Sequence, residues 1–305
     1  MSQGLPTGGY ESINPITVDD GDSFLGSDTT STTSLSPSVI NYREHHGRTY
    51  SNYKDVEDCA PKPSSRQPND EKQQGSLDIM HQMMLIYDKG NLFQAPVENP
   101  QCVLDVGTGT GIWAVDFASR FQSASVTGTD LSPIQPEWVP PNCSFELDNA
   151  NLKWNFPDNE FDFVHGSITD WKEFYGEAYR CLKPGGWIEH IDASATVTSD
   201  DSSIPPDCKT GKTFNPIISN KAWMEAVGFT ELQIQKRKMP IGNWPKDELM
   251  KEVGGYNLLG CEEGLEGYGQ WIMSQQSWTD EKMQVVFSKT REAMRDRKIH
   301  TYYLW

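Results

Sequence analysis

The sequence predicts an α/β protein with a doubly wound, mostly parallel sheet, and three observations lead to this prediction. A short apolar run that begins at Cys102 is followed by three alternating glycines and then by an amphipathic segment, 112–118. Strand, glycine turn and helix in this order open a doubly wound sheet, which binds ligands beyond its strand ends. Two further strand-like segments end on acids, at Asp130 and Asp148.

The expected elements fall into one folded domain behind an N-terminal tail. Residues 1–38 are rich in Ser, Thr, Gly and Asp, which predicts a disordered acidic tail. Residues 39–305 form the domain, with an N-terminal helical lid (39–98), a cofactor-binding half (99–192) and a substrate-side half (193–305). Helices are expected at 77–87, 112–118, 171–182, 222–227, 249–259 and 282–295. Strands are expected at 102–104, 125–130, 144–148, 161–165, 187–191, 232–235 and 300–305, which predicts a seven-stranded sheet with added helices.

The glycine turn indicates which ligand the sheet would bind. Its spacing is G-x-G-x-G, whereas a dinucleotide fingerprint is G-x-G-x-x-G with a pyrophosphate on the helix N-terminus. Asp105 stands two residues before the first glycine, and the loop contains no Lys or Arg. A carboxylate repels a diphosphate and attracts an ammonium or a sulfonium. S-adenosylmethionine (SAM) carries both cations and no phosphate, so we favour a SAM pocket over a nucleotide-type pocket or a purely structural turn.

The other strand-end acids agree with a SAM pocket. Asp130 occupies the position that grips ribose hydroxyls in this sheet type, and Asp148 suits an adenine amino group. No metal is expected, because the six cysteines form no C-x-x-C pair. The full set of predicted cofactor contacts is Asp105, Gly107, Thr108, Gly109, Gly111, Asp130, Leu131, Asp148, Asn149, Ala150 and His165.

Composition limits the possible partners and compartments. The formal net charge of −17 argues against direct nucleic-acid binding. There is no signal peptide and no apolar run long enough to span a membrane, so no membrane association is expected. The scattered cysteines favour a reducing compartment, the cytoplasm or alternatively the nucleus. A mean hydropathy of −0.61 is low for a fully folded chain and agrees with the predicted tail.

Several motifs resemble the fungal LaeA-like methyltransferases. They are the run Asp105–Gly111, the stretch from Thr129 to Asn142, the segment Tyr42–Tyr50, and Leu182–Trp187, together with Tyr256–Leu259 and Glu263–Gly267. The resemblance covers residue 40 to the C-terminus. It implies a Rossmann-like class I SAM-dependent methyltransferase fold, with cofactor contacts from Asp105, Gly107, Gly109, Asp130 and Asp148. The family contains a nuclear regulator of secondary metabolism and many enzymes that methylate small products.

The chain departs from the family pattern in two places that normally border the substrate. The segment between His165 and Ile168 is shorter than in relatives, and a loop between Pro206 and Asn215 replaces an extra helix. Within the lid, the segment 41–50 is expected to be a pre-helix that packs on the sheet domain. Alternatively, it covers the cofactor, with Arg48 or Tyr50 near its carboxylate.

Three functions remain open at this point. The first is a SAM-dependent methyltransferase with a small-molecule acceptor from fungal secondary metabolism, and the second is a LaeA-like regulator that works through protein partners. The third is a methyltransferase-fold protein that has lost methyl transfer. If the acceptor must lose a proton, His165 and His190 are the candidate bases by position, or they are structural histidines. Four tryptophans either line an apolar acceptor site or pack helices onto the sheet: Trp138, Trp154, Trp171 and Trp187.

Overall fold

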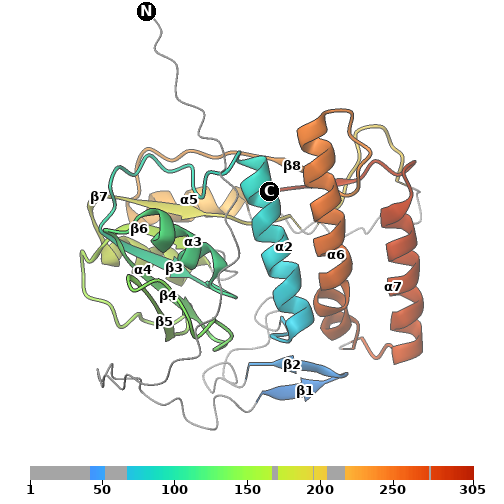
Figure 1. Ribbon diagram of the computed structural model, residues 1–305, viewed down its shortest axis with the longest axis horizontal. Coiled ribbons are helices and arrows are strands. Elements are labelled where there is room, and N and C mark those ends of the chain that lie inside the picture. Colours follow the sequence, from blue (N-terminus) through green and yellow to red (C-terminus); the bar gives the residue numbers. More distant parts are fainter. Residues whose placement is uncertain (1–41, 52–66, 167–170, 195, 205–216, 275) are drawn as a thin grey trace, which may run out of the picture. The chain divides into compact units, whose positions relative to one another are not determined.

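A computed structural model of the chain describes residues 42–51, 67–166, 171–194, 196–204, 217–274 and 276–305 (Figure 1). These residues all belong to one compact unit. The predicted acidic tail and the two departures from the family pattern, 166–168 in part and 206–215, lie outside the described residues. No helix in the described part of the chain is long and apolar enough to cross a membrane.

The core of the fold is a parallel sheet with the strand order β5-β4-β3-β6-β7. Each strand begins within about one residue of its predicted start, except the last, which begins five residues earlier. Their bounds are β3 (Cys102–Val106), β4 (Ser125–Asp130), β5 (Cys143–Leu147), β6 (Phe161–Gly166) and β7 (Leu182–His190). Because β4 and β6 flank β3 on opposite sides, the strand order reverses at β3. The crevice beyond the carboxyl end of β3 is therefore where such a sheet binds ligands.

The prediction of seven strands in this sheet is wrong for the residues that the structure describes, where the sheet has five. The predicted strand at 232–235 has no regular structure. Its Ile234 is 51% exposed, so the alternating apolar residues of this segment do not pack into a core as those of a strand would. Instead, β8 (Lys238–Pro240) pairs antiparallel with β9 (Tyr302–Leu304) in a separate two-stranded sheet. The buried side chains of Met239 and Tyr303 anchor this pair.

Helices cover both faces of the parallel sheet, as the alternation of its apolar residues requires. Val103 and Phe163 pack with α3 (Ile112–Arg120) on one face. Leu104 and Val164 pack with α4 (Trp171–Cys181) on the other, where α5 (Ile217–Val227) joins them.

A second layer consists of α2 (Glu71–Tyr87), α6 (Glu248–Ser274) and α7 (Asp280–Arg295), and Figure 1 shows α2 and α6 side by side. The α2 helix begins six residues before its predicted start at 77. The side chain of Asp70 accepts a hydrogen bond from the Gln73 amide and so caps the N-terminus of the helix. The α6 helix extends 15 residues beyond its predicted end at 259. The glycines of this extension allow close contact with α2.

That close contact follows a glycine stripe on α6. Gly260, Gly264 and Gly267 lie against Met80, Ser76 and Gln73 of α2, in antiparallel order. The Ser76 hydroxyl donates a hydrogen bond to the Gly260 carbonyl, at 2.8 Å. The glycines are therefore required by packing and not by turns.

The expected pre-helix at 41–50 is wrong, because this segment is a β-hairpin of β1 (Arg43–His45) and β2 (Arg48–Tyr50). Its two-residue turn, His46-Gly47, has positive φ at both positions (49° and 72°), which is the geometry that matches the twist of paired strands. The N-terminal part of the domain thus contains a hairpin and α2 and is not entirely helical.

Candidate functional site

The glycine loop between β3 and α3 uses its backbone amides internally. The amides of Gly107 and Thr108 both donate to the Thr129 carbonyl, at 2.8 and 2.9 Å, and that of Gly111 donates to the Thr108 carbonyl. The Gly109 amide donates to Oδ2 of Asp130, at 2.9 Å. A pyrophosphate cradle needs such amides to be free for the ligand. The amides of Gly107, Thr108, Gly109 and Gly111 are therefore not available to a phosphate.

Left-handed backbone explains why this loop is built from glycine. Gly107, Gly109 and Gly111 have φ values of 71°, 58° and 80°. At Gly111 the position is also crowded, because an ideal Cβ atom would lie 2.4 Å from the Phe145 ring. The loop can therefore close tightly over the end of β3 only without side chains.

Asp105 forms a buried network at the end of β3. Its Oδ1 lies 2.7 Å from Nδ1 of His165 on the adjacent strand β6, and its Oδ2 accepts a hydrogen bond of 2.5 Å from the Thr108 hydroxyl. The His165 ring stacks on Trp113, with a centroid distance of 3.8 Å. Asp105 is 3% exposed, so its carboxylate presents charge beneath the loop while its oxygens hold His165 and Thr108 in place.

Asp130 at the end of β4 accepts two backbone hydrogen bonds. Its Oδ1 accepts from the Ser132 amide and its Oδ2 from the Gly109 amide, both at 2.9 Å. Burial nevertheless raises the pKa of Asp130 to about 6, against the effect of these amides, and the negative charge of Asp105 adds to the rise. A carboxylate in this state gains from further hydrogen-bond donors, and the hydroxyls of a ribose are donors of this kind.

The end of β5 lies beside the end of β4 and carries the third acid. The pKa of Asp148 is raised by burial, although the Asn149 amide donates to its Oδ1 at 2.8 Å. The Asn149 side chain is buried and accepts from the Asn151 amide, and the Ala150 carbonyl accepts from the Trp154 indole. The three predicted acids thus lie at the carboxyl ends of three adjacent strands, β3, β4 and β5.

Residues from the N-terminal part of the domain contact the same edge. The Ser51 hydroxyl donates to the Leu131 carbonyl at 2.7 Å, and Tyr42 donates to the Pro133 carbonyl at 3.4 Å. In α2, Asp78 accepts a hydrogen bond of 2.6 Å from the Thr110 hydroxyl of the glycine loop. These contacts place the hairpin and the first turns of α2 around the residues predicted to bind the cofactor.

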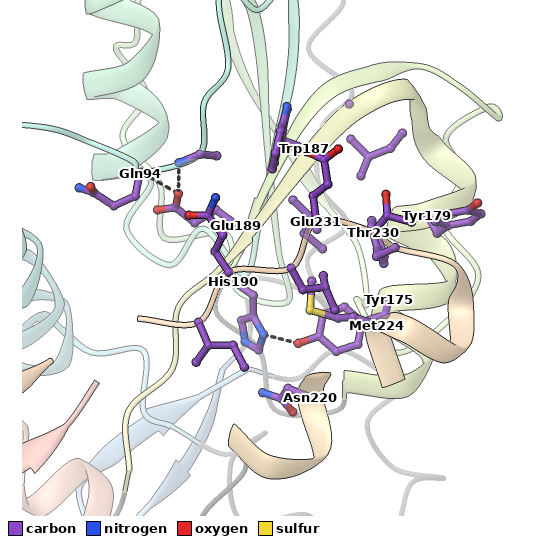
Figure 2. A pocket seen from close by; sticks show the side chains of 18 of the residues that line it. Gln94, Tyr175, Tyr179, Trp187, Glu189, His190, Asn220, Met224, Thr230 and Glu231 are labelled. Atoms are coloured by element: carbon purple, nitrogen blue, oxygen red, sulfur yellow. Dashed lines mark hydrogen bonds between the residues drawn. The ribbon is translucent and has the colours of Figure 1, made fainter. Parts of the chain in front are cut away.

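A cavity of about 600 Å³ runs along the outer edge of β7. Figure 2 shows its wall, to which β7 contributes Trp187, Glu189 and His190, and α4 contributes Tyr175. Glu189 stands in register with His165, which in turn stands beside Asp105. Neighbouring strands are about 4.8 Å apart, so only about 10 Å separates this wall from the strand that carries the glycine loop.

His190 is held as a neutral imidazole. Burial, and to a smaller extent the nearby His165, lower its pKa to about 3. Its Nδ1 lies 2.6 Å from the Tyr175 hydroxyl, the pair joined by a dashed line in Figure 2. Burial, and then the charge of Asp192, raise the pKa of Tyr175 well above its usual range, so the hydroxyl stays protonated and donates a hydrogen bond to Nδ1 of His190.

Asp192 is a lining residue that the sequence analysis missed. It follows β7, where no motif marks it, and only the position of the cavity identifies it. Its Oδ1 accepts from the Ala193 amide at 2.8 Å, while its Oδ2 is buried and has no hydrogen-bond partner among the described residues. Burial raises its pKa to about 6. A carboxyl group with this pKa can take up a proton near neutral pH.

The predicted catalytic histidines lie in different surroundings. His190 lines the cavity, whereas His165 is stacked on Trp113 and is not a lining residue, although Nε2 is buried in both histidines. The four tryptophans are also separated. Trp187 lines the cavity, Trp154 is 3% exposed in the core, Trp138 is 92% exposed, and the side chain of Trp171 lies outside the described residues. The alternative in which all four tryptophans line the acceptor site is therefore wrong. Trp187 and Tyr175 are among the aromatic side chains that line the cavity.

Comparison with known proteins agrees with this geometry. Residues 80–234 match the model of a family described as a methyltransferase domain. The chain is 34% identical to methyltransferase pytC of Aspergillus terreus, over 96% of this chain and 94% of that protein. It is also 34% identical to the secondary metabolism regulator LAE1 of Cochliobolus heterostrophus, over 78% of this chain and 87% of that protein.

A third relative is named for its substrate. The protein-methionine methyltransferase laeA of Emericella nidulans is 28% identical, over 88% of this chain and 78% of that protein. The match to pytC extends over almost the whole chain, and the family model includes the glycine loop. The chain therefore belongs to the methyltransferase-domain family and, within it, to the LaeA-like proteins of fungi.

Proposed function

We propose that this protein is a SAM-dependent methyltransferase that acts on a small molecule of fungal secondary metabolism. The observation that carries the proposal is the glycine loop, in which four amides are bonded internally while Asp105, Asp130 and Asp148 lie at the surrounding strand ends. This set of groups favours a ligand with cationic centres and ribose hydroxyls over a phosphate. SAM fits these groups, and the family membership of the chain supports the same cofactor.

The proposed cofactor contacts divide by strand. Asp130 and Leu131 at the end of β4 would hold the ribose, and Asp148, Asn149 and Ala150 after β5 would hold the adenine. Gly107, Thr108, Gly109 and Gly111 would pass beneath the amino-acid part. In this proposal Asp105 and His165 lie beneath the glycine loop and support it. His165 is a positioning residue, since its Nδ1 fixes the carboxylate of Asp105 and its ring is stacked on Trp113 and does not line the cavity.

The cavity along β7 is the proposed acceptor site. Its volume of about 600 Å³ lies within the range of about 300–1,000 Å³ typical of small-molecule sites. Aromatic and apolar side chains from Trp187, Tyr175 and Met224 line it beside the polar groups of His190 and Asp192. This composition suits a mainly apolar molecule with one or two polar groups.

The proposed mechanism rests on orientation and on one proton acceptor. When bound, SAM supplies a methyl group already activated by its sulfonium. The protein has to hold the acceptor in line with that group, and such orientation can contribute about 7–11 kcal/mol. Asp192 can take the proton of a hydroxyl or amine acceptor at its unpaired Oδ2. Neutral His190, with its Nδ1 bonded to Tyr175, adds an uncharged polar side chain to the wall of this site.

Calorimetry of SAM binding to the full chain tests the cofactor assignment. Asp130→Ala should weaken SAM binding about tenfold or more, because hydrogen bonds to a charged group contribute roughly 1.5–3 kcal/mol. Glu146→Ala, which removes an exposed carboxylate from the neighbouring strand, is the control and should bind SAM normally. No binding to the wild type, or equal affinity in the Asp130 variant, would refute the assignment.

A second candidate function follows from the relatives that are named secondary metabolism regulator and protein-methionine methyltransferase. A regulator would transfer the methyl group to a protein, and acidic proteins attract basic protein tails. Incubation with labelled SAM, core histones and a fungal metabolite extract separates the two candidates. Label in a small molecule supports the primary proposal, and label only in protein supports the regulator. Intact SAM binding without any labelled product supports a methyltransferase fold that has lost transfer.

A further inference from the structure

Two buried polar atoms on β2 have no hydrogen-bond partner among the described residues. They are Nη1 of Arg48 and the hydroxyl of Tyr50. Both side chains are more than nine-tenths buried, and they alternate with Thr49, so they point to the same face of the strand. Unpaired donors in such positions are unfavourable and uncommon, and two of them together indicate a missing acceptor.

The Arg48 guanidinium is fixed in orientation by Asp70. Its Nε and Nη2 donate to the two carboxylate oxygens of Asp70, at 2.5 and 2.8 Å, and Asp70 also caps the N-terminus of α2. Burial raises the pKa of Asp70, but the hydrogen bond and charge of Arg48 together with the backbone amides of Gln73 and Thr49 outweigh it, so the pKa falls below its ordinary value and the ion pair persists. This fork uses one edge of the guanidinium and leaves Nη1 available on another.

Tyr50 contributes a neutral donor beside this cation. Burial raises the pKa of Tyr50, and this effect exceeds the opposing effect of Arg48, so the hydroxyl stays protonated. An N–H group of a guanidinium and a phenol O–H together match one carboxylate, which accepts at both oxygens.

The two donors adjoin the proposed cofactor site on two sides. Ser51, next to Tyr50, donates to the Leu131 carbonyl at 2.7 Å. The side-chain amide of Asn69 donates to the hydroxyl of Ser132, two residues after Asp130, at 3.4 Å. From Asp70, two turns along α2 lead to Leu77, which contacts the Gly109 position of the glycine loop.

We propose that Arg48 and Tyr50 bind the carboxylate of SAM. This inference rests on the proposed function. The carboxylate is the one anionic group of SAM, and the acids at the strand ends would repel it, so it has to leave the sheet edge toward a cation. The face of β2 that carries Arg48 and Tyr50 supplies such a cation with a second donor beside it.

A pair of ligands that differ only in the carboxylate tests this assignment by calorimetry on the full chain. The ligands are SAM and decarboxylated SAM. The wild type should bind decarboxylated SAM about tenfold or more weakly, the change expected for hydrogen bonds to a charged group. Tyr50→Phe should weaken SAM about tenfold and leave the affinity for decarboxylated SAM unchanged within about twofold. Tyr42→Phe is the matched control, because that hydroxyl bonds to the Pro133 carbonyl, and it should affect both ligands equally.

The outcomes distinguish this inference from the proposed function. If the wild type binds SAM but Tyr50→Phe weakens both ligands equally or neither, the assignment of the carboxylate is overturned and the cofactor assignment stands. If the wild type binds neither ligand, both fail. Arg48→Lys gives a second measurement, since lysine can keep the ion pair with Asp70 but loses the fork. It should also reduce the preference for SAM over decarboxylated SAM, and an unchanged preference in both variants contradicts the inference.

Discussion

Burial shifts Asp192 and His190 in opposite directions, and both shifts favour the neutral form. The pKa of Asp192 rises to about 6 and that of His190 falls to about 3. Above pH 6, the folded state therefore holds Asp192 ionised at a cost. As the pH falls from 6 toward 4, the folded state takes up a proton that the unfolded state does not, and this cost disappears. His190 acts the other way, since only the unfolded state protonates it between pH 6.5 and 3.

The variant Asp192→Asn should for this reason stabilise the protein at pH 8 and much less at pH 5. Asparagine keeps the oxygen that accepts from the Ala193 amide and removes the ionised form. A pKa raised from 3.8 to about 6 sets an upper limit of about 3 kcal/mol on the gain, and solvent screening of this partly exposed residue makes the actual gain smaller. Thermal unfolding at the two pH values measures it. An equal change in melting temperature at pH 5 and pH 8 would show that the charge of Asp192 is not involved.

At the scale of elements, the neighbouring glycines 254 and 255 of α6 have different surroundings. An ideal Cβ atom at Gly254 would lie 2.1 Å from the backbone carbonyl oxygen of Gly242, whose own amide donates to the Gly254 carbonyl at 2.9 Å. At Gly255 nothing lies within 4 Å of such an atom. The first glycine therefore permits a contact between two backbones, and the second does not.

Gly254→Ala should destabilise the fold by about 2 kcal/mol or more, because the obstacle is backbone and cannot rotate away. Gly255→Ala should be neutral or stabilising by up to about 1 kcal/mol, since alanine favours the helix. Chemical denaturation of the two variants compares the free energies of unfolding. Similar values for both would mean that α6 can shift away from Gly242 without loss.

The elements also show what could be predicted from the sequence. The strands β3 to β6 and the acids at their ends carry local signals, an apolar run followed by glycine or acid, and the structure confirms these strands. The hairpin at 43–50 is not evident from the sequence because its turn, His46-Gly47, has histidine in place of the Asn or Asp that usually marks a two-residue turn. The length of α6 and the cavity depend on tertiary contacts, so neither Gly254 nor Asp192 could be assigned from sequence spacing.

For the molecule as a whole, the net charge of −17 bears directly on the proposed cofactor. SAM carries one net positive charge at neutral pH, from its sulfonium and ammonium against one carboxylate, whereas S-adenosylhomocysteine has no sulfonium and is neutral. A strongly acidic protein should therefore attract SAM over a distance at which its product feels no net force.

Ionic strength should consequently change the ratio of the two affinities. The Debye length falls from about 20 Å to about 4 Å between roughly 0.02 M and 0.5 M salt, which removes the long-range part of the attraction. We expect SAM binding to weaken by about two- to fivefold over this range while S-adenosylhomocysteine binding changes little. Calorimetry of both ligands at the two salt concentrations makes the comparison, with the neutral product as the internal control. Equal salt dependence would assign the recognition of the sulfonium to contacts at the strand ends alone, because buried charges such as Asp105 are screened far less than the surface.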